Sequence, residues 1–70
     1  MTRQYLDMNV RGTTYNIIFH AGKTNPFHIV KKWFAYDGEQ LKRKTQTVEK
    51  YADLKSCLYW LLENVPNTEG

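Results

Sequence analysis

The stretch YLDMNVRGTTYNIIFH, from Tyr5 to His20, decides the fold. Apolar and polar residues alternate from Tyr5 to Val10, which is the period of a half-buried β-strand. Arg11-Gly12 follows as a two-residue turn, because glycine readily takes the positive φ that such a turn needs. A run rich in β-forming residues, Thr13 to His20, begins directly after it. The sequence therefore predicts a β-hairpin with strands over 5–10 and 13–20.

The turn also predicts the register of this hairpin. With a two-residue loop, Val10 pairs with Thr13 and every earlier residue pairs in step. Because directly opposed residues share a face, one side of the hairpin gathers Leu6, Met8, Val10, Tyr15, Ile17 and Phe19. Turn chemistry and hydrophobic pattern thus agree.

A second hairpin is predicted further along the chain. A loop over 21–26 leads to a third strand over 27–36, and a turn at 37–39 leads to a fourth strand over about 41–48. The third strand has apolar residues at both parities, which is typical of a strand in the interior of a sheet.

The register of the second hairpin is chosen by charge. A two-residue loop would set Lys31 against Lys44, which is unfavourable, whereas a four-residue loop pairs Tyr36 with Leu41 and avoids the clash. Both registers place one set of residues on one face, Lys31, Trp33, Lys42 and Lys44, and a second set on the other, Phe34, Tyr36 and Leu41. A three-residue bulged loop is the alternative, and it would turn Trp33 and three lysines toward the helix.

One helical stripe is predicted near the C-terminus. Its members are spaced at i, i+3, i+4, i+7, i+8 and i+11, namely Leu54, Cys57, Leu58, Leu61, Leu62 and Val65. Asp53 suits the N-cap, Pro66 ends the helix, and residues 66–70 form a frayed tail. The expected fold is α+β: a single domain over residues 1–70, with an antiparallel meander of three or four strands followed by one amphipathic helix.

Composition bounds the environment and the partners. The 70 residues carry a net charge of +3 and one cysteine, Cys57, so no internal disulfide is expected. The lone cysteine is typical of a reducing compartment, and neither a signal peptide nor a membrane span is visible, so we expect a cytoplasmic protein. A core this small favours self-association, most simply as a homodimer.

Catalytic and metal motifs are weak. Gly22-Lys23-Thr24 resembles the end of a phosphate-binding loop, but Ile17 stands where that motif needs a glycine. His20, His28 and Cys57 are scattered single residues, unlike the paired ligands of zinc sites. We therefore expect no enzyme, no metal and no cofactor.

The constellation that points to a function is basic and aromatic. It consists of Lys31, Lys32, Trp33, Lys42, Arg43 and Lys44. Lysine and arginine neutralise phosphates, and flat aromatic rings stack on unpaired bases. The sequence predicts a nucleic-acid-binding face, for single-stranded DNA, around Trp33. The alternative is that these lysines are ordinary surface residues and that Trp33 packs under the helix.

Tyr59 and Trp60 form a second candidate surface on the shoulders of the helix. Large aromatic side chains outside a core stripe are typical of a protein interface. The alternative is that both rings pack on the sheet.

Two resemblances bear on function. The order of the basic-aromatic stretch from Phe27 to Phe34, the turn at 37–39, the basic stretch at 42–44 and the helix with Tyr59-Trp60 resembles the C-terminal domain of the transcriptional coactivator PC4 and its bacterial relatives. That resemblance implies a sheet followed by a helix, dimerisation, and binding of single-stranded DNA by basic and aromatic sheet residues.

The chain is also similar to short proteins of phages and mobile elements of Gram-positive bacteria. The suggestive pieces are Asn25-Pro26-Phe27 and the stretch from Lys50 to Leu54. This second resemblance implies a compact inhibitor of a host protein, such as an anti-CRISPR-like or other anti-defence factor.

Overall fold

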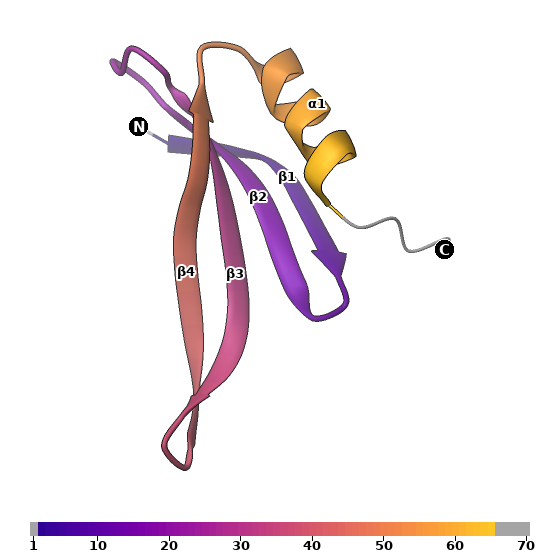
Figure 1. Cartoon of the computed structure of the whole chain (residues 1–70). Coiled ribbons are helices and arrows are strands. Elements are labelled where there is room, and N and C mark those ends of the chain that lie inside the picture. The colour runs from indigo at the N-terminus through magenta and orange to yellow at the C-terminus, as the bar shows by residue number, and fades with distance from the viewer. Residues whose placement is uncertain (1, 66–70) are drawn as a thin grey trace.

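A computed structural model describes residues 2–65 and has an α+β fold. Its elements are β1 (Thr2–Val10), β2 (Thr13–His20), β3 (Phe27–Asp37), β4 (Gln40–Tyr51) and α1 (Leu54–Asn64). The strands form one antiparallel sheet in the order β1-β2-β3-β4, with α1 on one face (Figure 1). The predicted meander and C-terminal helix are confirmed. The predicted tail, with the helix-ending Pro66, lies outside the described residues.

The register of the first hairpin is confirmed. Val10 pairs with Thr13. Arg11 and Gly12 both have positive φ, at 52° and 86°, as a type I′ turn requires. β1 starts three residues earlier than predicted, and its register shifts between Gln4 and Leu6. This shift is a β-bulge, which the alternation of residues 5–10 does not indicate.

The predicted register of the second hairpin is also confirmed. Tyr36 pairs with Leu41, and Lys44 lies opposite Trp33 instead of Lys31. Pairing continues to Asp37 and Gln40, so the loop has two unpaired residues, not four, in the same register. β4 runs to Tyr51, three residues beyond the predicted end, across a register shift beside Ile29.

The pairing of β3 with β2 corrects one expectation. Ile17 lies opposite Ile29 and Tyr15 lies opposite Lys31. Because opposed residues share a face, and Ile17 and Ile29 pack under α1, Lys31 and Trp33 belong to the helix side of the sheet. We expected them to face away from the helix. The reason is that the sequence predicts the register of β3 with β4 but not its register with β2, because β3 has apolar residues at both parities.

The core is a small cluster between α1 and the two central strands. It consists of Ile17, Ile29, Cys57 and Leu61, all buried. Partly buried side chains surround it, including Leu6, Met8, Phe27, Leu54 and Trp60. This small cluster stabilises the end of the molecule that carries α1. The opposite end has no buried cluster among the described residues.

The helix begins as predicted but buries a narrower stripe. Asp53 is the N-cap, and its carboxylate accepts a hydrogen bond of 2.8 Å from the backbone N–H of Ser56. Cys57 and Leu61 are buried, whereas Leu58 and Leu62, predicted on the packed stripe, are exposed. A single sheet layer touches one side of the helix only. No helix in residues 2–65 has the length and apolar composition needed to cross a membrane.

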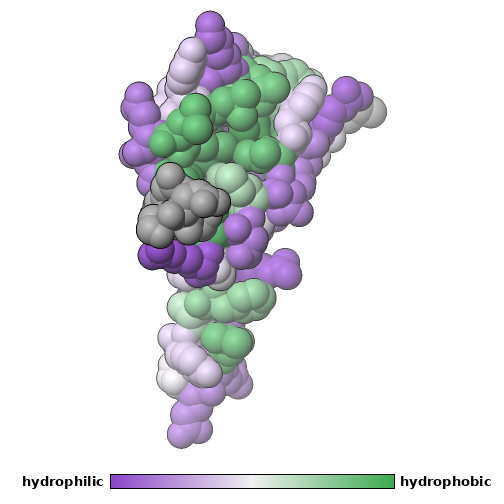
Figure 2. All heavy atoms as spheres, turned by 90° about the vertical axis from the view of Figure 1, so that its right-hand side faces the viewer, coloured by the Kyte–Doolittle hydropathy of each residue, from purple (hydrophilic) through white to green (hydrophobic). Residues whose placement is uncertain are grey.

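The helix covers only part of the sheet. Its 11 residues span about 16 Å, while the 11 residues of β3 span about 36 Å. Figure 1 shows β3 and β4 continuing well past the β1–β2 turn, away from α1. Figure 2, seen from the side of α1, shows hydrophobic surface gathered in the upper part of the molecule and a smaller hydrophobic area on the hairpin below.

Candidate functional site

The far part of the β3–β4 hairpin, residues 31–44, is called the distal hairpin below. The last β2–β3 pair joins Thr14 to Lys32, so from Trp33 onward β3 pairs only with β4. Residues 33–44 thus form a two-stranded ribbon (Figure 1), and Lys31 and Lys32 lie at its base, where β3 still pairs with β2. The distal hairpin contains all six residues of the predicted nucleic-acid-binding set.

The distal hairpin carries the whole net charge of the chain. Five of the ten basic residues lie in it, against two of the seven acidic ones, Asp37 and Glu39. The remaining residues balance, because they hold five basic and five acidic side chains. Asp37 forms an exposed ion pair of 3.3 Å with Lys42, a contact worth little in water. The positive field of the molecule is therefore centred on this ribbon.

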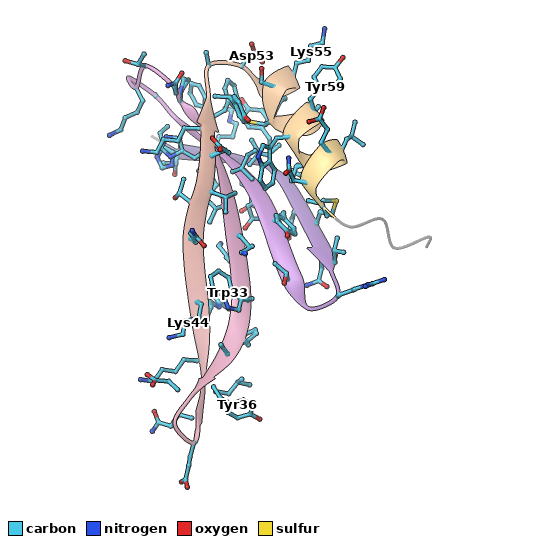
Figure 3. The ribbon with its side chains drawn as sticks, in the orientation of Figure 1. Trp33, Tyr36, Lys44, Asp53, Lys55 and Tyr59 are labelled. Carbon is cyan, nitrogen blue, oxygen red and sulfur yellow. The ribbon has the colours of Figure 1, made fainter. Side chains whose placement is uncertain are left out.

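Three of the predicted residues meet on the helix side of the ribbon. Trp33 lies opposite Lys44 on the neighbouring strand, and both lie well away from α1 (Figure 3). Lys31 Nζ lies 4.9 Å from the centroid of the Trp33 ring, which is cation–π geometry. Trp33 is half-buried and is not among the side chains packed on the core. The expected cluster of lysines around Trp33 is present, although on the helix side.

The other face of the distal hairpin, called the open face, holds the more exposed rings. Phe34 is 59% exposed and Tyr36 is 74% exposed. Arg43 lies opposite Phe34, with its guanidinium carbon 5.8 Å from the ring centroid. Lys32 and Leu41 share this face by alternation along their strands. The open face therefore has its own combination of cations and flat rings.

A polar hollow of about 280 Å³ adjoins the open face. Residues of β1 and β2 contribute to its lining, among them Asp7 and Asn16. From the distal hairpin it is lined by Lys32, Trp33, Phe34 and Arg43. Asn16 is buried, and its amide N–H groups donate to the carbonyl of Leu6 at 3.0 Å and to the carboxylate of Asp7 at 3.4 Å. The hollow is thus lined by fixed polar groups on one side and by cations and rings on the other.

The two aromatic residues of the predicted protein interface lie in different environments. Trp60 is half-buried and packs on the core cluster. Tyr59 is 55% exposed, with Lys55 Nζ 5.8 Å from its ring centroid, and both point outward from α1 (Figure 3). Leu58 and Leu62 are exposed on the same helix. The structure therefore groups Tyr59 with Leu58 and Leu62 as one exposed surface and separates Trp60 from it.

The fold brings two of the three soft ligands together, His20 and His28, and keeps Cys57 apart from them. The rings of His20 and His28 lie 4.2 Å apart, while Cys57 is buried in the core. Burial raises the pKa of the Cys57 thiol above its ordinary value, with the charge of Asp53 adding to the shift. Within residues 2–65, no three His, Cys, Asp or Glu side chains come together as a metal site would need.

Two parts of the site were missed by sequence reasoning. Phe34 and Tyr36 were assigned to the face opposite the lysines, with no expectation that they would be exposed. The signal was the difference in length between an 11-residue helix and the long third and fourth strands, which leaves one end of the hairpin uncovered on both faces. The polar hollow depends on the β1–β2–β3 register, and no local pattern indicates it.

Comparisons of the chain with protein-family models, with curated proteins and with solved structures find no match in any of the three. The two resemblances therefore stay predictions, and the functional argument rests on the geometry of the distal hairpin.

Proposed function

We propose that this chain is a small nucleic-acid-binding module that takes single strands on its distal hairpin. The observation that carries the proposal is the concentration of the whole net charge of +3 on the distal hairpin, which also bears exposed rings. Lysine and arginine along the ribbon would contact phosphates, and releasing the counterions of a strand gives affinity without sequence preference.

Stacking distinguishes a single strand from a duplex on this surface. Unpaired bases can stack on flat rings for about 1–3 kcal/mol each, whereas paired bases in a duplex are not available. Phe34 and Tyr36 offer the most exposed rings, and Trp33 offers a third once Lys31 moves from its face. We further propose that the module acts in the cytoplasm, where the unpaired Cys57 stays reduced.

The first test is a titration of a labelled single-stranded oligonucleotide at two salt concentrations. We expect affinity to fall as salt rises, with a slope of about 0.7 per phosphate neutralised. Replacing Lys42 and Lys44 together by Gln should lower both the affinity and the slope. A matched control replaces Lys50 and Lys55 by Gln. These lysines lie outside the distal hairpin, and their replacement lowers the net charge by the same amount. Absent binding, binding that ignores salt, or equal losses in the two variants would overturn the proposal.

The second test separates stacking from charge. Tyr36→Ala removes a highly exposed ring and should not disturb folding. We expect it to weaken single-strand binding by about fivefold or more while duplex binding changes little. Trp33→Ala should act in the same direction. Equal losses for single strand and duplex would show that the rings do not stack on bases.

A second candidate function is protein binding by the outer surface of α1. Leu58, Tyr59 and Leu62 are exposed together on one helix, and Leu62 reaches 79%. Such a surface suits a second copy of the chain or a host protein that the chain would inhibit. Replacing Leu62 by Lys should abolish any self-association seen by analytical ultracentrifugation, and should abolish any nuclease-resistant capture of a host protein, while leaving oligonucleotide binding intact.

A further inference from the structure

The polar hollow beside the open face has a defined chemistry. Asp7, Asn9, Thr14 and Asn16 line it from β1 and β2, where the pairs Asp7–Asn16 and Asn9–Thr14 lie directly opposite each other. Its volume of about 280 Å³ is at the lower limit of ordinary ligand pockets, which suits a small planar group better than a large ligand.

Two asparagine amides donate hydrogen bonds within the hollow. Asn9 Nδ2 donates to Thr14 Oγ1 at 3.0 Å, and Asn16 Nδ2 donates to the Leu6 carbonyl at 3.0 Å and to Asp7 Oδ1 at 3.4 Å. An ionised carboxylate accepts only, and its two oxygens offer about four lone-pair positions. Asp7, which is exposed, therefore keeps capacity to accept from a ligand.

The carboxylate of Asp7 repels phosphate, although it lies beside a basic surface. Lys32 and Arg43 line the same hollow and attract the backbone of a strand, whereas Asp7 repels it. An uncharged base that presents N–H donors is therefore a better partner for Asp7 than the phosphate backbone. Guanine is the base whose Watson–Crick edge presents two adjacent N–H donors, so one carboxylate can accept both in the bidentate manner that favours planar partners.

We infer that this hollow binds a single unpaired guanine of a strand lying on the distal hairpin, and that Asp7 is its specificity-determining residue. The inference rests on the proposed function. Phe34 lines the hollow from β3 and offers its ring to the face of the base. Lys32 and Arg43 take the phosphates on either side of that nucleotide. The strand would then bind along the ribbon without sequence preference, and one base would be recognised specifically.

The test compares an oligothymidylate with the same strand carrying one central guanine. We expect wild-type protein to bind the guanine strand about tenfold more tightly, the scale of one good bidentate contact. Inosine at the same position lacks the exocyclic amino group and should lose most of this preference, a result that needs no protein variant. Asp7→Asn should lose the preference while binding oligothymidylate at least as well as wild type does.

The matched control is Glu63→Gln, which changes the net charge equally but lies on α1. It should keep the guanine preference. Wild-type protein that binds both strands equally, or Asp7→Asn protein that keeps the preference, overturns the inference and leaves the proposed function standing. Failure to bind any strand overturns the proposed function and the inference together.

Discussion

The contact between His20 and His28 is expected to make the stability of the fold sensitive to pH. The rings of His20 and His28 lie 4.2 Å apart. The pKa of His28 is lowered from its ordinary value of 6.5, first by burial and then by the nearby charges of His20, Lys50 and Lys23. In the folded protein His28 therefore stays neutral at pH values where the same imidazole is already protonated in the unfolded chain.

The sign of the pH dependence follows from this difference. Below about pH 7 the unfolded state binds more protons than the native state, so the free energy of unfolding falls as the pH falls through 6.5. We expect urea unfolding at pH 7.5, 6.5 and 5.5 to show progressively lower stability. His28→Gln should flatten that decline, while Lys50→Gln, which leaves the burial of His28 in place, should keep most of it. An unchanged decline in His28→Gln would refute this origin.

Single residues also mark where sequence reasoning reached its limit. Trp33 and Lys44 were predicted to share a face, and they do, because opposed residues and alternation depend only on local register. Whether that face lies toward α1 depends on β2, which pairs Ile17 with Ile29. Ile29 and Val30 are adjacent, both apolar and both buried, so the sequence contains no pattern that selects one of them for the core.

At the scale of elements, the helix depends on its N-cap. Asp53 accepts from the backbone N–H of Ser56, and this bond lowers the pKa of its carboxyl below the ordinary value. The first turn of α1 has no acidic residue and the last turn has no basic one, so no other side chain opposes the helix dipole at these ends.

Removing this cap should weaken the whole fold, because α1 contributes half of the buried cluster. Asp53→Ala is expected to lower the free energy of unfolding by about 1 kcal/mol, measured by urea denaturation at pH 7. Asp53→Asn keeps the capping oxygen and should retain most of the stability. Equal losses in the two variants would assign the effect to the charge instead of the hydrogen bond.

The elements differ in how far the sequence could predict them. The Arg11-Gly12 turn and the alternation before it predicted the register of the first hairpin, and charge avoidance predicted that of the second. The helix was predicted from its periodicity, yet Leu58 and Leu62 proved exposed. Periodicity predicts which helix residues share an apolar face. How many of those residues are buried depends on how much sheet lies beneath the helix.

At the scale of the whole molecule, the fold divides into a cored end and an uncored end. The buried cluster joins α1 to the central strands, while the distal hairpin extends beyond it as a two-stranded ribbon. The proposed binding surface is therefore separated in space from the buried cluster. Substitutions of exposed side chains on the ribbon should alter binding with little effect on folding, and substitutions in the cluster should do the reverse.

Leu61 and Leu62 test this division of the molecule, because they are adjacent residues of the same type. Leu61 is 6% exposed within the cluster, and Leu62 is 79% exposed on the outer surface of α1. Leu61→Ala should cost about 2–5 kcal/mol, a large share of the roughly 5–15 kcal/mol typical of native proteins. Leu62→Ala should change the free energy of unfolding by no more than about 0.5 kcal/mol, measured by urea denaturation at low protein concentration.

Repeating the Leu61 and Leu62 measurements at several protein concentrations then addresses the outer surface of α1. If a second copy covers Leu62, the stability of wild-type protein rises with concentration, because association favours the folded state. Leu62→Ala should lose that concentration dependence, while Leu61→Ala should be less stable at every concentration. Wild-type stability that is independent of concentration would exclude self-association over the range measured and leave the helix surface to a different protein partner.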